Sequence, residues 1–498
     1  MSQPLICLTL TGKTLKEDID ILEKYRNYID VAELRADFLT DDERLVIRKF
    51  PAMASIPCIL TIRRKVDGGQ FIEGEATRSV LFAKALSFVD QDTSRNFAYV
   101  DFEEDYHVSS LQDAATAYGL RIIRSIHDMK NPIANIAQRL ERLRASDFEI
   151  PKIAFMPHSL DDVKLAFDET AKLKNSNHIV IAMGPLGEPT RILSAKLKNY
   201  LTYCSPPETN ANLKDIGHLD PIILNSCYRF HKIKEETALY GITGWPLKKT
   251  GSPDLHNAGY EKHGLDAVYV PIRSESFRDV MEFAEVAGIK GLSVTIPHKE
   301  TVLDNVDIVD KTVLEVGASN TIVKDENGKW HAYNTDVIGF SKSLLEFIGR
   351  KNLAHKKVAI IGAGGASRAV AYVVKNLKGD ACVFNRTIKK AQELAESYGF
   401  KYANLSAESM DMLKKYSDVI IQTTSVGMNS DLSSNEENDP LYFYDFTGKE
   451  MLFDIVYVPA VTPVMARAAK AGCKVSNGYD MLRYQGYEQF KLFTGIEY

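Results

Sequence analysis

Several features that define whole classes of protein are missing from this sequence of 498 residues. No apolar run approaches the roughly 18 residues that a membrane span needs, and no basic stretch precedes the apolar residues at the N-terminus. The six cysteines are scattered and form no Cys-x-x-Cys pair, which argues against a disulfide framework and a structural zinc site. We therefore expect a cytoplasmic protein without a targeting peptide, a membrane segment or a metal.

An excess of charge of one sign is also missing. The 61 basic and 66 acidic residues leave a net charge of −5, and no long run carries one sign. This balance excludes an electrostatic nucleic-acid binder, whereas the 45% hydrophobic and 26% charged residues are ordinary for a globular protein. At about 150 residues per domain, the length suits two or three domains. The expected partners are small molecules, and the sequence is compatible with either a monomer or a weak homo-oligomer.

The first 205 residues alternate short apolar runs with amphipathic stretches. In the stretches, apolar residues recur at steps of three and four, as in Leu15, Ile19, Leu22 and Tyr25. The expected strands are residues 5–10, 30–34, 58–63, 97–101, 120–126, 152–156, 178–183 and 201–204. Eight strands alternating with helices predict a (β/α)8 TIM barrel.

Polar side chains gather where these strands end, and that end of a barrel carries its chemistry. Lys152 lies in an apolar strand, so it either extends to solvent or is desolvated, which lowers an amine's pKa as a Schiff-base nucleophile requires. His127, at another strand end, suits a structural or a catalytic role. The guanidinium groups of Arg35, Arg63 and Arg191 are suited to clamp a carboxylate.

Together these residues resemble the type I 3-dehydroquinate dehydratases, over about residues 5–205. The motifs are Glu33-x-Arg35-x-Asp37, Arg63 with Gly68-Gly69, Ser125-x-His127-Asp128, Ile150-Pro151-Lys152-Ile153-Ala154 and Arg191. The resemblance implies that Lys152 forms an imine with the substrate ketone, while His127 removes the adjacent proton and helps to expel water. It implies a substrate-binding set of Glu33, Arg35, Arg63, Asp67, Arg191 and Ser205.

Two positions depart from that family. Asp67 stands where the family usually has a glutamate that orients the histidine, and aspartate is one methylene shorter. The closing-loop motif Ser-Ala-Pro-Gly-Gln reads Ser205-Pro206-Pro207-Glu208-Thr209, and threonine reaches less far than glutamine. These departures leave open an alternative in which the barrel is a degenerate domain that only binds, beside an active dehydrogenase.

A second αβ pattern begins after residue 236. Strands are expected at residues 239–243, 267–272 and 291–296, and Asp325-Glu326-Asn327-Gly328 predicts a hairpin between residues 320–323 and 330–333. Residues 206–236 read as a connection with one helix around residues 221–231. We expect a barrel over residues 1–220, a linker over 221–236, a substrate lobe over 237–340, a nucleotide lobe over 341–475, and a C-terminal helix over 476–498 that returns to the substrate lobe.

A glycine-rich turn marks the nucleotide lobe. An apolar strand runs into Gly362-Ala363-Gly364-Gly365-Ala366-Ser367 and then a helix, as in the dinucleotide-binding fingerprint of a Rossmann-like fold. The next strand ends in Asn385-Arg386-Thr387, where an NAD-binding domain has an acidic residue for the ribose 2′-hydroxyl. An arginine and a hydroxyl suit a 2′-phosphate, so the sequence predicts NADP.

Two polar motifs lie outside this turn. Ser293-Val294-Thr295-Ile296-Pro297-His298-Lys299 ends a strand, and Asn334-Thr335-Asp336 opens a helix. A lysine and an aspartate so placed can pair across a cleft and exchange an alcohol proton, although Asp336 alone would also suit a helix N-cap.

The second half resembles shikimate dehydrogenase over about residues 237–498. The added motifs are Ser252-Pro253-x-x-His256-Asn257, Gly317-Ala318-x-Asn320-Thr321, Asp454-x-Val456-Tyr457 and Gly478-x-x-Met481-Leu482-x-x-Gln485. The resemblance implies a catalytic dyad of Lys299 and Asp336. It implies substrate binding by Thr250, Ser252, Thr295, Asn320, Tyr457 and Gln485, and a cofactor site that adds Thr424, Ser425, Met428 and Gly478 to the turn and to residues 385–387.

Two departures here leave the choice between shikimate and quinate open. The usual His-Ser-x-Ser-Pro loop reads Lys249-Thr250-Gly251-Ser252-Pro253, and Ser293 replaces a common asparagine. Since the two resemblances are consecutive steps of aromatic biosynthesis, the sequence predicts a bifunctional enzyme. Its first half would convert 3-dehydroquinate to 3-dehydroshikimate, and its second half would reduce that product to shikimate with NADPH.

Overall fold

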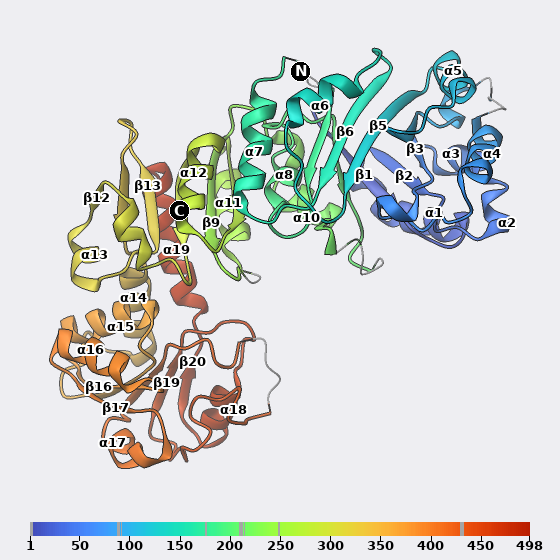
Figure 1. The fold of residues 1–498 in the computed structure, drawn as a ribbon. Helices are drawn as coiled ribbons and strands as arrows, with labels where there is room; N and C mark the ends of the chain where they lie inside the picture. The colour runs from blue at the N-terminus through green and yellow to red at the C-terminus, as the bar shows by residue number, and fades with distance from the viewer. Residues whose placement is uncertain are drawn as a thin grey trace. The chain divides into compact units, whose positions relative to one another are not determined.

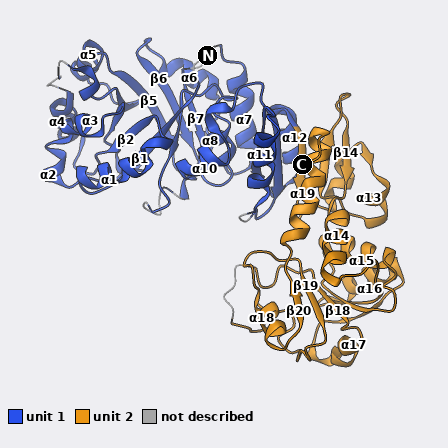
Figure 2. Cartoon of the chain, turned by 180° about the vertical axis from the view of Figure 1, so that it is seen from behind, with its two compact units in different colours: residues 1–289 blue, residues 290–498 orange. Residues whose placement is uncertain are grey.

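The structure is a computed structural model (Figure 1), and it describes residues 3–86, 90, 92–174, 177–208, 213, 215–247, 250–428 and 433–498. The chain divides into two compact units, Met1–Ile289 and Lys290–Tyr498 (Figure 2). Within the described ranges, no helix is long and apolar enough to cross a bilayer.

Unit 1 begins with an eight-stranded parallel sheet in the order β7-β6-β5-β4-β3-β2-β1-β8. Its strands are β1 (Leu5–Leu10), β2 (Val31–Arg35), β3 (Cys58–Thr61), β4 (Tyr99–Glu103), β5 (Arg121–Asp128), β6 (Glu149–Phe155), β7 (Ile179–Ala182) and β8 (Leu201–Cys204). A bridge between His178 and Asn199 joins the sheet's two edges. The predicted eight-stranded barrel is thus confirmed.

Helices surround this sheet (Figure 1). They include α1 (Leu15–Tyr25), α4 (Glu75–Leu86), α5 (Ser109–Ala117), α6 (Ile136–Leu143), α7 (Leu160–Ala171) and the short α8 (Glu188–Ile192). The strands are largely buried on both faces because helices cover one face and the barrel interior fills the other. Cys7, Val31, Ile59, Ile123 and Ile150 form a fully buried cluster. This packed interior leaves the strands' carboxyl ends to carry the polar side chains.

The remainder of unit 1 packs against the barrel. It contains α10 (Pro221–Ser226), β9 (Ala238–Gly244), α11 (Ser252–Lys262), β10 (Ala267–Arg273) and α12 (Phe277–Ala287), with β9 and β10 paired in parallel. Helix α12 lies on α7, where the rings of Phe167 and Phe283 meet edge to face at 5.3 Å and Lys164 Nζ lies 2.7 Å from Glu282 Oε2. The first helices and strands of the second αβ pattern therefore share a compact unit with the barrel.

Unit 2 opens with a small mixed sheet. Strands β11 (Ile289–Val294), β13 (Thr321–Lys324) and β14 (Trp330–Tyr333) are antiparallel neighbours, and β12 (Ile308–Val309) runs parallel to β14. In the turn between β13 and β14, the Gly328 N–H donates to the Asp325 carbonyl at 3.0 Å, and Gly328 takes a φ of 80°. The predicted hairpin is confirmed.

The rest of unit 2 is built on a parallel sheet in the order β17-β16-β15-β18-β19-β20. Its strands are β15 (Lys357–Ile361), β16 (Asp380–Asn385), β17 (Lys401–Asn404), β18 (Val419–Gln422), β19 (Met451–Asp454) and β20 (Lys474–Ser476). Its helices include α14 (Asp336–Ile348), α15 (Gly365–Asn376), α16 (Ile388–Tyr398), α18 (Pro463–Lys470) and α19 (Tyr479–Thr494). The strand order reverses between β15 and β18, and such a switch point is where open α/β sheets bind ligands.

The C-terminal helix α19 fixes α14 by a close approach. A Cβ added at Gly339 of α14 would lie 2.7 Å from Gln485 Cβ and 2.8 Å from the Met481 carbonyl oxygen, so only glycine allows this spacing. At the other end of α19, Phe493 covers Gly291 of β11. Helix α19 thus connects β11 with the helix that carries Asp336.

Candidate active sites

A pocket in unit 1 is lined by the residues predicted for the barrel site. Its walls include Glu33, Arg35, Arg63, Asp67, His127, Lys152 and Arg191. They come from five different strands or the segments that follow them. Ser205, the remaining member of the set, is buried beside β8, and its N–H donates to the Leu219 carbonyl at 3.1 Å. Thr209 of the expected closing loop lies outside the described residues.

Lys152 is desolvated. Its side chain comes from β6, the residue is only 5% exposed, and Nζ donates to Asp101 Oδ2 and to the Tyr203 hydroxyl, each at 3.1 Å. Of the two interpretations of a lysine in this strand, burial is therefore confirmed. The amine lies in the pocket with a carboxylate as its ionic partner.

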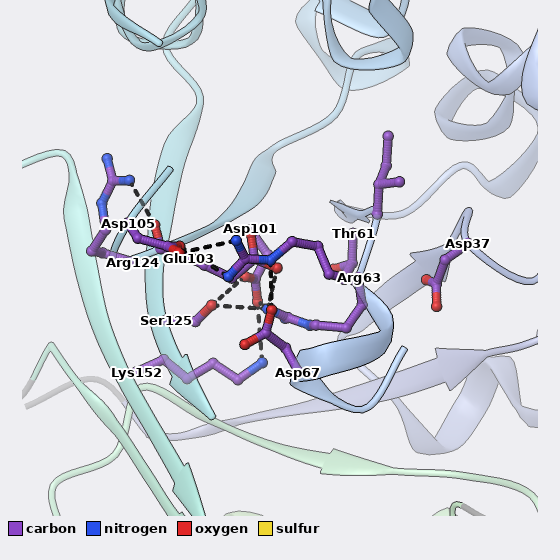
Figure 3. A network of polar contacts seen from close by, with 12 residues as sticks. Asp37, Thr61, Arg63, Asp67, Asp101, Glu103, Asp105, Arg124, Ser125 and Lys152 are labelled. Carbon is purple, nitrogen blue, oxygen red and sulfur yellow. Dashed lines mark hydrogen bonds and ion pairs between the residues drawn. The ribbon is translucent and has the colours of Figure 1, made fainter. Parts of the chain in front are cut away.

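Asp101 is the centre of a buried network (Figure 3). Arg63 Nη2 lies 2.8 Å from Asp101 Oδ2, and Ser125 Oγ donates to Oδ1 at 2.6 Å. Burial by itself would raise the pKa of Asp101, but the charges of Arg63 and Lys152 outweigh it and lower that pKa. Asp101 is therefore a carboxylate at neutral pH, one that two cations share.

Sequence reasoning missed this carboxylate and its neighbour Glu103, which accepts from Arg63 Nη1 at 2.9 Å. The available signal was two acids, two residues apart, in the strand Tyr-Val-Asp-Phe-Glu. Side chains at that spacing point to the same side of a strand, and here both are buried.

The three predicted arginines have different partners. Arg35 makes a bidentate pair with Asp37, at 2.9 and 2.8 Å, and Arg63 binds Asp101 and Glu103. Arg191 is 1% exposed, and the acceptors found for it within the described ranges are the carbonyls of Ile216 at 2.7 Å and Tyr203 at 3.3 Å. Of the three-arginine clamp, Arg191 alone thus lacks a carboxylate partner in the part of the chain described.

Burial lowers the pKa of the Arg191 guanidinium to about 10. Its Nε is also buried without a hydrogen-bond partner among the described residues. A buried cation in this condition is stabilised by an anion that supplies charge and acceptor oxygens.

His127 is held with a neutral imidazole. Burial lowers its pKa well below the ordinary value, and the nearby charges of Arg63 and Lys152 lower it further. Nδ1 is buried and finds no partner in the described ranges. Asp67, at the position of the family's orienting glutamate, accepts from Arg64 Nε at 2.7 Å.

Two further pocket residues were missed. Tyr203 of β8 presents its hydroxyl to Lys152, and His218 lines the pocket with a buried Nδ1 that has no partner among the described residues. Burial lowers the pKa of His218, and Arg191 is the first of the cations that add to the effect. His218 follows the altered closing loop, where no periodic pattern was available to predict it.

A second polar centre lies in unit 2. Lys299 Nζ lies 2.5 Å from Asp336 Oδ2, and the Asn320 amide donates to Oδ1 of the same carboxylate at 2.9 Å. Asp336 is the first residue of α14, and Thr335 occupies the N-cap position. The N-cap alternative for Asp336 is therefore wrong, because its carboxylate faces Lys299.

Asn320 joins the dyad to α19. Its Oδ1 accepts from the Thr335 N–H at 2.8 Å, and its amide lies 3.3 Å from Gln485 Oε1. One turn further along α19, Gln489 donates to Thr321 Oγ1 at 2.9 Å and accepts from Ser293 Oγ at 2.8 Å. Gln489 was missed, although residues four apart share a helix face and Gln485 had been predicted.

The other expected substrate residues are found on other segments of the chain. In unit 1, the Thr250 and Ser252 hydroxyls lie 3.2 Å apart at the start of α11; Lys249 lies outside the described residues. In unit 2, Thr295 follows β11 and Tyr457 follows β19, each partly exposed.

The glycine turn lies between β15 and α15. Gly362 takes a φ of 113°, and a Cβ there would lie 2.6 Å from Thr423 Oγ1. Ser367 accepts from the Gly364 N–H at 3.0 Å, and its hydroxyl lies 2.7 Å from the Thr423 hydroxyl. The serine in place of a third glycine therefore ties the turn to the end of β18. A Cβ at Gly365 would lie 3.3 Å from Lys299 Cδ, so the turn lies beside the dyad.

The remaining residues predicted to bind the cofactor lie at or after the carboxyl ends of strands of the parallel sheet. Asn385, Arg386 and Thr387 end β16 and lead into α16, with Arg386 and Thr387 exposed. Thr424, Ser425 and Met428 follow β18. A Cβ at Gly478 would lie 2.0 Å from the Ile455 carbonyl oxygen, so this position requires glycine. These strand ends suit a dinucleotide, because glycine turns and helix N-termini accommodate a pyrophosphate there.

Comparison with family models matches residues 6–235 to type I 3-dehydroquinase, residues 242–322 to the shikimate dehydrogenase substrate binding domain, and residues 344–470 to shikimate / quinate 5-dehydrogenase. The shikimate dehydrogenase (NADP(+)) of Aquifex aeolicus is 38% identical over 269 residues, which cover 53% of this chain and 94% of that protein. The chain belongs to the shikimate dehydrogenase family.

A second relative covers both halves. The chloroplastic bifunctional 3-dehydroquinate dehydratase/shikimate dehydrogenase of Arabidopsis thaliana is 29% identical over 515 aligned positions, which cover 99% of this chain and 82% of that protein. A crystal structure of shikimate dehydrogenase from Aquifex aeolicus, at 36% identity, matches 53% of this chain and 96% of its own with a TM-score of 0.48. The family models and the relative from Arabidopsis thaliana show the bifunctional architecture: a type I dehydroquinase lyase domain precedes a shikimate dehydrogenase oxidoreductase domain. Both predicted resemblances are confirmed.

Proposed function

We propose that the barrel converts 3-dehydroquinate to 3-dehydroshikimate through an imine on Lys152, and that the dehydrogenase half reduces this product to shikimate with NADPH. The observation that carries the proposal is the pocket itself, where Lys152 lies buried among the side chains that the family resemblance implies.

In the barrel, Lys152 Nζ passes a proton to neutral His127 and attacks the ketone carbon as the free amine. The ketone oxygen then takes up that proton and leaves as water, which forms the imine. The imine draws electrons from the adjacent C–H bond, so neutral His127 can take that proton as a general base. His127 then returns a proton to the departing hydroxyl, which leaves as water. Hydrolysis of the imine releases the product and regenerates Lys152.

Arg191 binds the substrate carboxylate in this proposal. It is buried in the pocket, has no carboxylate partner in the described ranges, and carries an unpaired Nε. Glu33 accepts hydrogen bonds from the Thr9 and Thr61 hydroxyls and is thereby held to receive a ring hydroxyl.

In the dehydrogenase half, Lys299 donates the proton to the carbonyl oxygen and Asp336 holds the ammonium at 2.5 Å. Asn320 and Gln485 present amides around the dyad for the substrate hydroxyls. NADPH, when bound, supplies the hydride. The exposed Arg386 and Thr387, at the end of β16, are suited to bind its 2′-phosphate.

Borohydride in the presence of 3-dehydroquinate tests the imine. Reduction would add the substrate's carbon skeleton irreversibly to Lys152, detected as a mass increase on the peptide that contains this residue. Lys152→Ala is the matched control and should remain unlabelled. A wild-type chain that reduces 3-dehydroshikimate yet takes no label would instead support the alternative of a barrel that only binds.

We propose shikimate rather than quinate as the dehydrogenase product, because the relatives at 35–38% identity are named shikimate dehydrogenases. Comparing NADP-dependent oxidation of the two compounds tests this choice, and a clear preference for quinate would overturn it.

A further inference from the structure

An ion pair connects the helix that carries Arg191 to the beginning of the dehydrogenase half. Glu188 is the first residue of α8, the short helix that also carries Arg191, and it binds Arg273, the last residue of β10. Arg273 also donates to the Pro185 carbonyl at 3.2 Å and, through Nε, to the Leu247 carbonyl at 3.4 Å. Arg273 lies within the segment matched to the substrate binding domain of shikimate dehydrogenase.

The pair is largely removed from water. The side chains of Glu188 and Arg273 are 14% and 18% exposed. Burial raises the pKa of Glu188, and the positive charges of Arg273 and Arg191 oppose that rise. Glu188 therefore lies within the electrostatic range of two arginines but makes its ion pair with the one from β10.

Arg191 is three residues from Glu188 in the same helix, and residues at that spacing are neighbours on a helix surface. If Arg273 were absent, Glu188 would be a buried carboxylate without a partner, which is strongly unfavourable. Arg191 is the nearest available cation on its own helix, and a carboxylate bound there would compete with an incoming substrate carboxylate.

We propose that Arg273 is a positioning residue for the dehydratase reaction: by engaging Glu188, it leaves Arg191 free to bind the substrate carboxylate. The inference rests on the role of Arg191 in the proposed function. It means that the first segment of the dehydrogenase half completes the electrostatics of the barrel site.

Two substitutions, made singly and together, test the inference. Arg273→Gln alone should raise the KM for 3-dehydroquinate by about tenfold, the equivalent of about 1.4 kcal/mol, with a much smaller change in kcat. Adding Glu188→Gln should return the KM to near the wild-type value, because the competing charge is gone. Arg273→Lys keeps the charge and should stay close to wild type.

Three controls separate the outcomes. Arg278→Gln removes an 83% exposed arginine that pairs with Glu282 and should change nothing. Reduction of supplied 3-dehydroshikimate reports whether each variant is folded. Arg191→Gln should raise the same KM; if it does not, the proposed role of Arg191 fails.

If Arg191→Gln raises the KM and Arg273→Gln does not, the inference alone fails. The inference also fails if the KM for 3-dehydroquinate rises in Arg273→Gln and stays raised when Glu188→Gln is added. Arg273 would then act through packing and not through its charge on Glu188.

Discussion

Lys152 and Arg63 are two buried cations, and Asp101 is the carboxylate that touches both. Buried charges of this kind are stable only when they are paired. The same carboxylate that keeps Lys152 in the pocket therefore also supports the fold around it, so the function and the stability of the barrel depend on one residue.

Asp101→Asn should lower the free energy of unfolding of the barrel by about 3–5 kcal/mol, because it removes one partner from a buried ionic network. Urea-dependent hydrogen exchange, followed on peptides from β3 to β6, measures this change in the barrel alone. Asp105→Asn is the matched control, since Asp105 is a 60% exposed partner of Arg64, and it should cost less than about 1 kcal/mol. Equal effects of the two substitutions would contradict the buried network.

His127 should be neutral well below its ordinary titration range. The proposed reaction needs the neutral imidazole, and burial with the charges of Arg63 and Lys152 lowers the pKa of His127 below its ordinary 6.5. The imidazole should therefore stay neutral as the pH falls through 6.5 and take up a proton only at lower pH. The measurement is the pH titration of the His127 ring by NMR, assigned with His127→Gln. A titration midpoint at or above pH 6.5 would mean that the imidazole is not held neutral.

At the scale of elements, the strands and the hairpin could be predicted because their signals are local. Apolar runs of β-branched residues define the barrel strands, and Asp325-Glu326-Asn327-Gly328 defines the turn between β13 and β14. Motifs placed Lys152, His127 and Arg191 on strand ends, where the structure brings them to one pocket. Contacts between strands carry no such local signal, so the pairing of Asp101 with Lys152 and the partners of the three arginines appeared only in the structure.

One glycine of the turn between β15 and α15 is not explained by the packing of the fold. Gly364 has a φ of −99°, and a Cβ there would meet nothing within 4 Å. Folding therefore does not require glycine at this position, whereas the proposed approach of a pyrophosphate to the backbone would require it.

Gly364→Ala should leave the melting temperature of the ligand-free chain unchanged and weaken NADPH binding by about tenfold, equivalent to about 1.4 kcal/mol. NADPH fluorescence titration and calorimetry measure the two quantities. Gly478→Ala is the contrasting variant. Its new Cβ would lie 2.0 Å from the Ile455 carbonyl oxygen, so this substitution should lower the melting temperature. Unchanged NADPH affinity in Gly364→Ala would show that the pyrophosphate does not approach this turn.

For the whole molecule, the sequence pattern and the packing divide the chain at different places. A new αβ pattern starts after residue 236, but the compact units divide at residue 289. The difference arises because α12 packs on α7 through Phe167 and Phe283, and β10 binds α8 through Arg273. A linear pattern records where a new fold begins and contains no information about which neighbour it packs against.

We propose that one chain carries two reactions in sequence, each on its own lysine. This can be tested by supplying 3-dehydroquinate and NADPH to the purified chain and following shikimate formation by chromatography. We expect the wild-type chain to form shikimate and Lys152→Ala to form none, although this variant should still reduce supplied 3-dehydroshikimate. Lys299→Ala should accumulate 3-dehydroshikimate instead. Loss of both activities in Lys152→Ala, or shikimate formation from 3-dehydroquinate without Lys152, would contradict this proposal.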